Sequence, residues 1–135
     1  MLRKNAKIDL ISRVPLFAGC SKRELGEIAS LADELALPAG RKLTAEGASG
    51  QEFVVLVDGA AEVKRGGRLI ARLGPGDFLG EISLVTGRKR TATVTTTAPS
   101  RLLVVSAPGF RRLMRALPTL HVKVLEALAA RLPTE

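Results

Sequence analysis

Residues 53–57, FVVLV, run directly into residues 58–59, DG, and residues 61–64, AEVK, run toward the glycine pair at 66–67. The first run is apolar and β-branched, as in a buried strand, and the second alternates in polarity. Asp-Gly and Gly-Gly are typical of tight turns between antiparallel strands, because glycine adopts positive φ at little cost. These residues predict a series of hairpins at the centre of the chain.

The same pattern extends to both sides of this segment. Ten of the 13 glycines lie between Gly40 and Gly87 and divide this region into short pieces. Residues 68–73, 91–97 and 101–106 supply further strands. Seven or eight short strands without long helices between them favour antiparallel pairing in a small barrel or roll. We place this β region at residues 38–106.

Helices are predicted on both sides of the β region. In residues 21–24, SKRE, a serine precedes a glutamate by three residues, which is the capping-box pattern of a helix start. The amino-terminal region, residues 1–37, is therefore predicted to be helical, with an apolar face formed by Leu25, Ile28, Ala29, Ala32 and Leu35. Residues 107–132 predict two helices separated at Pro118, whose apolar stripes are Phe110, Leu113, Met114 and Leu117, and then Leu120, Val124, Leu125, Leu128 and Leu132. Residues 1–135 are thus expected to form a single α+β domain.

Composition excludes several classes of protein. The chain has 135 residues, of which 46% are hydrophobic and 25% charged, as in an ordinary globular domain. Cys20 and His121 are the only residues of their kinds, so we expect no intrachain disulfide and no metal cluster. No apolar run approaches the about 18 residues of a membrane span, and the expected location is cytoplasmic. A nucleophile, base and orienting acid are not visible as a set, so no enzymatic activity is predicted.

The basic charge is concentrated in the second half. The formal net charge is +8, and no carboxylate occurs between Ile82 and Leu125. Eight cations fall in that interval: Arg88, Lys89, Arg90, Arg101, Arg111, Arg112, Arg115 and Lys123. Such a field suits an anionic partner, although a basic surface that only confers solubility is the alternative. Direct DNA binding is not expected, because aromatic residues make up 3% and no recognition-helix pattern is present.

Residues 78–92, FLGEISLVTGRKRTA, contain the strongest candidate for a binding site. We interpret them as a short helical turn from Gly80 to Gly87, followed by a basic run that enters a strand. The free N–H groups of a helix start attract anions, and an arginine can add a bidentate pair to a phosphate. Glu81 would suit sugar hydroxyls, so the set fits a sugar phosphate. Alternatively, Glu81 only complements the helix dipole and residues 88–90 form a solvated turn.

Residues 80–84, GEISL, and 90–94, RTATV, resemble the phosphate-binding cassette of cyclic nucleotide-binding domains. Such domains occur in catabolite-activator-type regulators, protein kinase A regulatory subunits and cyclic-nucleotide-gated channels. The resemblance covers nearly the whole chain. It implies an antiparallel, jelly-roll-like β-roll with an amino-terminal helical element, a short cassette helix within residues 78–92, and two carboxy-terminal helices that act as hinge and lid.

The resemblance also implies roles for individual residues. Arg90 would pair with the exocyclic phosphate, and Glu81 would accept a hydrogen bond from the ribose 2′-hydroxyl. Further contacts would come from the backbone N–H groups of Gly80, Ile82, Ser83 and Thr91. The Thr91 hydroxyl could reach the 2-amino group of a syn guanine, and the alternative is a threonine that only caps its strand.

The sequence also departs from the family pattern. Lys89 occupies the position before the arginine, where the family often has proline. The chain has no Trp and no Tyr to cover the base. Arg131 in the last helix is then the candidate for stacking on the purine, because a guanidinium can replace an aromatic ring there. The alternative is a solvent-facing arginine that complements the helix dipole.

Taken together, these features predict a module that binds a cyclic nucleotide, with cAMP as the first candidate and cGMP as the second. Ligand binding would shift a conformational equilibrium and signal to an unidentified effector protein or domain. The leucine stripe of the last helix permits a homodimer. The alternative function is a basic protein-interaction domain of the same fold that binds no nucleotide.

Overall fold

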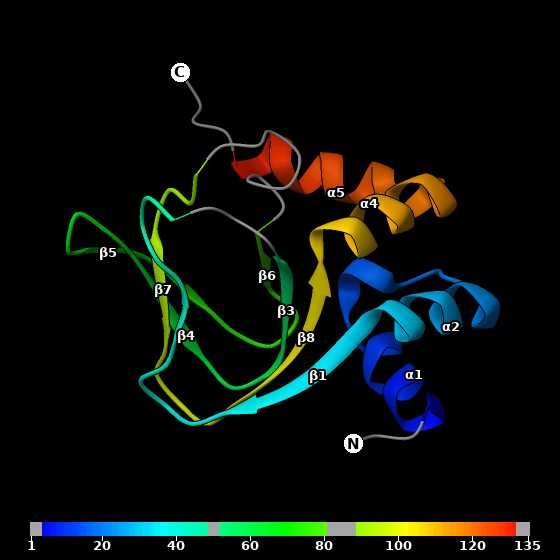
Figure 1. Cartoon of the computed structure of the whole chain (residues 1–135), viewed down its shortest axis with the longest axis horizontal. Helices are drawn as coiled ribbons and strands as arrows, with labels where there is room; N and C mark the ends of the chain where they lie inside the picture. The colour runs from blue at the N-terminus through cyan, green and yellow to red at the C-terminus, as the bar shows by residue number, and fades with distance from the viewer. Residues whose placement is uncertain (1–3, 49–51, 81–88, 132–135) are drawn as a thin grey trace.

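The computed structural model describes residues 4–48, 52–80 and 89–131. Two four-stranded sheets form a roll, and the helices gather on one side of it (Figure 1). One sheet has the order β1-β8-β3-β6 and the other β2-β7-β4-β5, and every pairing is antiparallel. The strands are β1 (Ala32–Leu37), β2 (Lys42–Thr44), β3 (Glu52–Asp58), β4 (Ala61–Arg65), β5 (Arg68–Leu73), β6 (Phe78–Leu79), β7 (Thr93–Thr96) and β8 (Ser100–Ser106). The predicted α+β fold with an antiparallel β-roll is confirmed.

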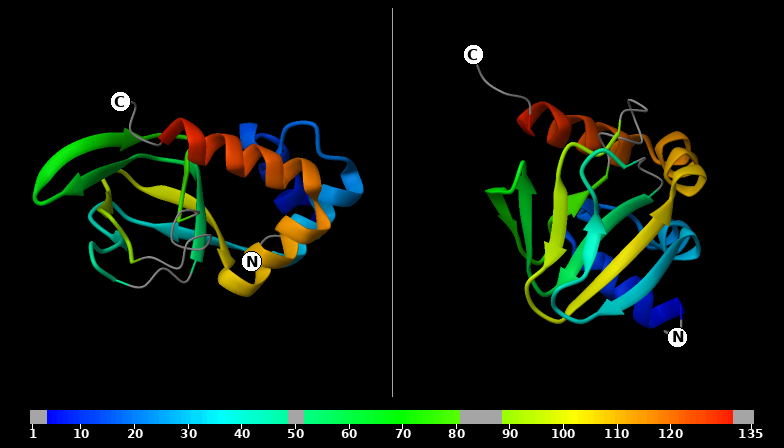
Figure 2. Two further views of the ribbon diagram at one scale, coloured as in Figure 1. Left: turned by 90° about the horizontal axis from the view of Figure 1, so that it is seen from above. Right: turned by 60° about the vertical axis from the view of Figure 1, so that its left-hand side comes forward.

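The glycine pair predicted as a turn joins β4 to β5. Gly66 and Gly67 have φ values of 58° and 78°, so both central residues of this two-residue turn are left-handed, as in the hairpin turns that match strand twist. Strand β5 lies at the edge of its sheet, and its residues from Arg68 to Arg72 are exposed. The hairpin therefore projects from the roll, with β4 toward the interior of the sheet (Figures 1 and 2).

Helical segments of the described residues flank the strands: α1 (Lys4–Ser12), η1 (Pro15–Phe17), α2 (Lys22–Leu31), α4 (Ala107–Ala116) and α5 (Pro118–Arg131). The capping box of α2 is present, because the Glu24 N–H donates to Ser21 Oγ at 3.1 Å and the Ser21 N–H donates to Glu24 Oε1 at 2.7 Å. Pro118 begins α5, where its missing N–H costs nothing. In the described part of the chain, no helix combines the length and hydropathy of a membrane span.

The predicted end of the amino-terminal helical region at residue 37 is wrong. Helix α2 ends at Leu31, and Ala32–Leu37 forms β1, which pairs with β8 from Ala32 opposite Val105 onward. A contact distant in sequence marks the transition, since Lys7 Nζ donates to the carbonyl of Ala29 at 3.2 Å and to that of Ala32 at 2.8 Å. The β-roll therefore begins at Ala32 rather than at residue 38.

Strand β3 is buried on both faces and divides the apolar interior into two clusters. Phe53 and Val55 face the helices, whereas Val54 and Leu56 face the inside of the roll. This explains why the run FVVLV shows no alternation in polarity. Phe53 also connects two elements, because its ring centroid lies 5.5 Å from that of Phe78 and 4.9 Å from that of Phe110.

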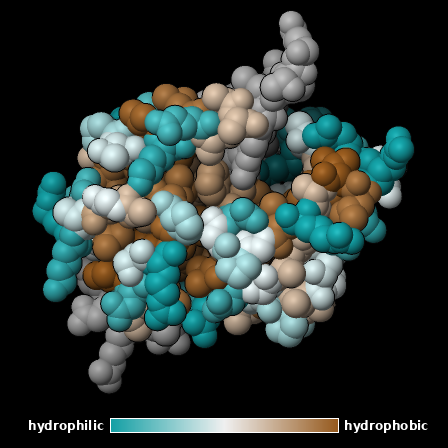
Figure 3. Space-filling model, turned by 180° about the vertical axis from the view of Figure 1, so that it is seen from behind, coloured by the Kyte–Doolittle hydropathy of each residue, from teal (hydrophilic) through white to brown (hydrophobic). Residues whose placement is uncertain are grey.

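Helix α5 packs with only part of its predicted stripe. Leu120 and Val124 are buried against the helical cluster, but Leu125 is 47% exposed and its neighbour Val122 is 52% exposed. Leu120 and Val124 are four residues apart and share one face of the helix, whereas Leu125 is one position beyond Val124 and is turned away from that face. Leu125 is therefore not part of the buried stripe. Polar and apolar side chains are mixed over the back surface of the molecule (Figure 3).

Candidate nucleotide-binding site

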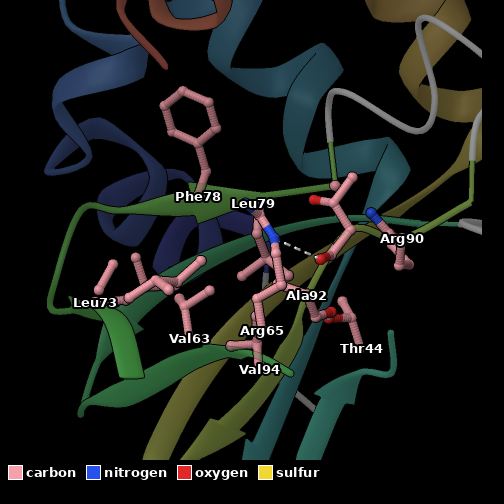
Figure 4. Close-up of a pocket in the computed structure, with 13 residues that line it drawn as sticks. Thr44, Val63, Arg65, Leu73, Phe78, Leu79, Arg90, Ala92 and Val94 are labelled. Atoms are coloured by element: carbon pink, nitrogen blue, oxygen red, sulfur yellow. Dashed lines mark hydrogen bonds between the residues drawn. The ribbon is translucent and has the colours of Figure 1, made fainter. Parts of the chain in front are cut away.

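A cavity of about 360 Å³ opens between the β4–β5 hairpin, β6 and the segment that leads into β7 (Figure 4). Its walls are mostly apolar, and its polar side chains come from opposite sides. The apolar wall residues include Val63, Ile70, Ala71, Leu73, Leu79 and Val94, and the polar ones are Thr44, Arg65, Arg90 and Thr91. A cavity of this kind suits a small ligand that has an apolar face and a charged group.

Strand pairing explains the apolar wall. Val63 of β4 lies opposite Ala71 of β5, so both side chains point to the same face of the hairpin. The register shifts between Val63 and Lys64. Such a bulge adds one residue to β5 and interrupts the alternation of its side chains between the two faces of the sheet. Ile70 therefore lines the cavity together with its neighbour Ala71.

Arg90 brings a partly buried positive charge to the cavity. Its Nη2 donates to the Glu52 carbonyl at 2.6 Å. Burial lowers the pKa of the Arg90 guanidinium and the charge of Glu52 opposes that shift, but an arginine remains protonated in proteins. Within the described residues, no carboxylate oxygen lies within 4.0 Å of this guanidinium.

The backbone around Arg90 is fixed on both sides. The Arg90 N–H donates to the Ala48 carbonyl at 2.7 Å, and the Arg90 carbonyl accepts from the Gly47 N–H at 2.9 Å. Gly80 lies against the guanidinium with φ of 99°, and a Cβ there would be 2.7 Å from Arg90 Nη1 and in collision with the Glu52 carbonyl. Only glycine leaves Arg90 its present position.

Residues 34–116 match the family model for the cyclic nucleotide-binding domain. The chain belongs to this family. The match runs from β1 to the end of α4 and includes Gly80, Arg90, Thr91 and the whole cavity wall. The resemblance found in the sequence is thereby confirmed.

Relatives of this cyclic nucleotide-binding domain are regulatory proteins. A cAMP-dependent protein kinase regulatory subunit of Eremothecium gossypii is 31% identical over 107 residues, which are 78% of this chain and 23% of the relative. The catabolite activator protein of Thermus thermophilus is 30% identical, with a TM-score of 0.79 over 87% of this chain and 57% of that one. The regulatory domain of Toxoplasma gondii PKA, co-crystallised with cAMP, has a TM-score of 0.82 at 20% identity over 96% of this chain and 51% of that one, which shows a shared fold. The chain spans about a quarter of the length of the curated relatives it matches.

The predicted site residues fall into three groups in this domain. Gly80, Arg90 and Thr91 come together around the cavity. Glu81, Ile82 and Ser83, with the predicted helical turn from Gly80 to Gly87, lie outside the described residues. Arg131 is the last residue of α5, and its side chain is likewise outside the description.

Two residues near the cavity were missed from the sequence. Glu52 supplies the carbonyl that holds Arg90, and Arg65 donates from Nε to the Thr91 carbonyl at 3.0 Å. The position of Arg65 could have been predicted from the alternation of side chains along β4, because Arg65 shares a strand face with Val63 and with the buried Ala61. Nothing in the sequence pairs Glu52 with Arg90, which lies 38 positions away.

The described residues contain no cluster of three or more metal-ligating side chains. His121 is exposed on α5. Burial and the charge of Glu24 raise the pKa of the Cys20 thiol, with Lys123 opposing the shift. Cys20 therefore stays a neutral thiol near pH 7 and lacks the character of an activated nucleophile.

Proposed function

We propose that this domain binds a cyclic nucleotide in the cavity beside Arg90, with cAMP as the first candidate and cGMP as the second. The observation that carries the proposal is the Arg90 guanidinium itself. It is partly buried, held by a carbonyl rather than neutralised by a described carboxylate, and adjacent to an apolar wall. Partial desolvation of a cation is costly, and a ligand phosphate would offset that cost.

The rest of the cavity supports the same ligand class. A cyclic nucleotide has one negative phosphate, a ribose hydroxyl and a flat purine with apolar faces. Arg90 would hold the phosphate, and the wall formed by Val63, Ala71 and Leu73 would lie against the purine. Relatives with the same fold support this assignment, since the Toxoplasma gondii domain was crystallised with cAMP.

The remaining roles follow from the family pattern. Glu81 would accept a hydrogen bond from the 2′-hydroxyl, and backbone N–H groups would complete the phosphate and ribose contacts. Those groups belong to Gly80, Ile82, Ser83 and Thr91. Arg131 would stack on the base from α5 in the ligand-bound state.

A row of aromatic rings supports a regulatory role. Phe78 lines the cavity, Phe53 contacts it at 5.5 Å between centroids, and Phe110 of α4 contacts Phe53 at 4.9 Å. The Phe78 ring packs against the helical cluster, so a ligand that shifts β6 would disturb the packing of α4 through it, and α5 follows α4 after a single residue. This is how binding would shift the population of helix positions and signal without a covalent step.

The receiver of the signal is a further part of the proposal. Kinase regulation is the first candidate, because the curated relatives are regulatory subunits of cAMP-dependent protein kinases. The receiver would be an effector protein, another domain of a longer chain or a second copy in a homodimer. The cytoplasmic location and the lack of catalysis stay predictions from the sequence.

The proposal is tested by thermal unfolding of protein refolded from denaturant, with cAMP, cGMP or 5′-AMP. At 100 times the dissociation constant, a ligand stabilises the fold by about 2.7 kcal/mol, which raises Tm by roughly 10 °C for a domain of this size. Arg90→Ala should weaken binding by at least about 100-fold, because it removes the partner of a buried charge. Arg72→Ala is the matched control, since Arg72 is an exposed arginine of β5 outside the cavity lining.

Two results would contradict the proposal. An unchanged dissociation constant in Arg90→Ala would remove Arg90 from the site. No stabilisation of the wild-type domain by either cyclic nucleotide would instead favour the basic protein-interaction domain that binds no nucleotide.

A further inference from the structure

Strand β1 leaves one edge of the roll without a neighbouring strand among the described residues. It is the outer strand of the sheet β1-β8-β3-β6 (Figure 1). Its six residues pair with β8 without a break in register, from Ala32 opposite Val105 to Leu37 opposite Ser100. The side chain of Leu35 is 44% exposed on this strand. A regular strand with a free edge and an exposed leucine is able to pair with a strand of another molecule.

The direction of the backbone groups of β1 follows from the bonds of the neighbouring strands. The Leu56 N–H donates to the Asp77 carbonyl at 2.8 Å, and the Leu56 carbonyl accepts from the Gly76 N–H at 2.7 Å, so both groups of Leu56 point away from β8. Leu102, opposite Leu56 on β8, therefore directs its own N–H and carbonyl toward β1. Leu102 lies opposite Leu35, so Leu35 uses its backbone groups within the sheet.

Glu34 and Ala36, the neighbours of that leucine, carry the free backbone groups of the edge. Alternate residues of an antiparallel strand face opposite sides, so both direct their N–H and carbonyl groups away from β8. Neither backbone forms another hydrogen bond within the described part of the chain. Ala32 faces the same way but is already satisfied, because its N–H donates to the Ile28 carbonyl and its carbonyl accepts from Lys7 Nζ at 2.8 Å.

These free groups match a second copy of the same strand. When two β1 strands run antiparallel with Leu35 of each copy opposite the other, Glu34 of each lies opposite Ala36 of the other. The free donors and acceptors then bond to one another, and the two exposed leucines are buried together. In this register Ala32 meets Pro38, which has no N–H to donate and whose carbonyl already accepts from Thr96 Oγ1 at 2.8 Å. The pairing therefore ends where the free groups end.

The distribution of charge favours β1 over β5, the outer strand of the other sheet. In the register just described, Glu34 faces an alanine and Asp33 faces Leu37 of the second copy, so no like charges lie opposite each other. Strand β5 instead carries Arg68 and Arg72, and its register with β4 is broken by a bulge. Charged residues and bulges protect an edge from pairing. Strand β1 has a regular edge without this pattern of cations.

We propose that β1 is a self-association surface, at which two copies of this chain pair about a two-fold axis through Leu35 and join their sheets into one. The interface is isologous, because the same residues contribute from both copies. A single pair of strands buries less than the about 1,200 Å² of a standard interface, so the dimer is weak and forms at high protein concentration. The pairing does not involve the nucleotide cavity and is independent of the proposed function.

Sedimentation equilibrium without nucleotide tests the proposal, at protein concentrations up to about 1 mM. The average mass of the wild-type chain should rise with concentration toward twice that of a single chain. Leu35→Arg should weaken the association by at least about 10-fold, because it brings two guanidinium groups together at the two-fold axis. Leu69→Arg on β5 is the matched control, since Leu69 is also 44% exposed, and it should associate as the wild type does.

A mixture of two variants tests the register. Leu35→Arg and Leu35→Glu should each remain monomeric when measured alone. Mixed in equal amounts, they should form a heterodimer, because the register places opposite charges face to face at the axis. Recovery of the dimer in the mixture also shows that neither variant lost association through misfolding, and far-ultraviolet circular dichroism checks the fold of each variant directly.

Four results would overturn the proposal. The first is a wild-type chain that stays monomeric over the whole concentration range, and the second is wild-type association in Leu35→Arg. The third is a mixture of Leu35→Arg and Leu35→Glu that stays monomeric. The fourth is loss of association in Leu125→Arg but not in Leu35→Arg, which would place the dimer on α5, where Leu125 is 47% exposed. None of these results bears on nucleotide binding beside Arg90.

Discussion

Replacing Gly80 by alanine tests the contact on which the position of Arg90 depends. Gly80 has φ of 99°, and a Cβ there would be 2.7 Å from Arg90 Nη1 and would collide with the Glu52 carbonyl. The carbonyl cannot yield cheaply because it belongs to the backbone of β3, whereas the guanidinium is the end of a side chain and can move only by leaving that carbonyl. The methyl group must therefore displace Arg90 from its acceptor.

The expected cost has two parts. An L-residue at positive φ costs about 1–2 kcal/mol, and loss of the charge-assisted bond from Arg90 to Glu52 costs about 1.5–3 kcal/mol. Gly80→Ala should therefore destabilise the domain by about 2.5–5 kcal/mol, summed from both terms. Gly40→Ala is the matched control, because Gly40 has φ of 86° and its added Cβ meets no atom within 4 Å. Gly40→Ala should therefore lower the free energy of unfolding only by the cost of an L-residue at positive φ, about 1–2 kcal/mol.

The assay is urea unfolding of both variants followed by circular dichroism, with the nucleotide dissociation constants measured on the same samples. Gly80→Ala should lose at least about 1.5 kcal/mol more than Gly40→Ala, the lower value for the lost charged bond, and it should also bind cAMP more weakly. Equal destabilisation of the two variants, with unchanged binding, would refute the steric account of Gly80.

Three further predictions concern the amino-terminal helices. Lys7→Met should destabilise the fold by about 2 kcal/mol, because the carbonyls of Ala29 and Ala32 lose a charged donor; a free energy of unfolding equal to that of the wild type would contradict this reading of the α2–β1 junction. Ser21→Ala should cost about 1 kcal/mol in urea unfolding through loss of the cap on α2, and a cost near zero would show that the cap is not needed. Hydrogen bonds from the Ser21 backbone and side chain lower the pKa of Glu24. The contribution of Glu24 to stability is therefore present above the pKa of this carboxyl in the unfolded chain and is lost as pH falls through its pKa in the folded chain. The stability difference between wild type and Glu24→Gln should therefore vanish in acid, and a difference independent of pH would contradict it.

Short sequence patterns were sufficient to predict those structural features that depend on residues adjacent in the chain. The turn at Gly66-Gly67, the capping box at Ser21 and the helix break at Pro118 all depend on one or two adjacent residues. Each was predicted correctly. The β3 run was also recognisable, because strands buried on both faces are continuously apolar.

The end of α2 could not be found in this way. Ala32 continues the helical spacing of Ile28 and Ala29, so the pattern favours a longer helix. The observed end instead coincides with the bonds from Lys7 and with the pairing of Ala32 to Val105, both of which are remote in sequence. Tertiary contacts therefore override the local preference here.

In the candidate site, too, the residues of one short motif were predicted, whereas a residue placed by strand pairing was not. Gly80, Arg90 and Thr91 were found because they belong to one short motif, and they line one cavity in the structure. Arg65 reaches Thr91 only because β4 pairs with β7 in a register that places Lys64 opposite Thr93. No local pattern specifies that register, so the second guanidinium could not be assigned before the fold was known.

The exposed edge at β5 has a consequence for concentrated solutions of the protein. Leu69 and Ile70 are 44% and 48% exposed on this strand, and a bare apolar edge tends to pair with the same edge of another molecule. Arg68 and Arg72 flank the two residues, and Arg65 lies opposite Arg68 on β4. Two such edges in contact would bring these cations together. Salt screens charges beyond about 10 Å at 0.1 M, so the hairpin that walls the cavity also makes colloidal stability depend on ionic strength.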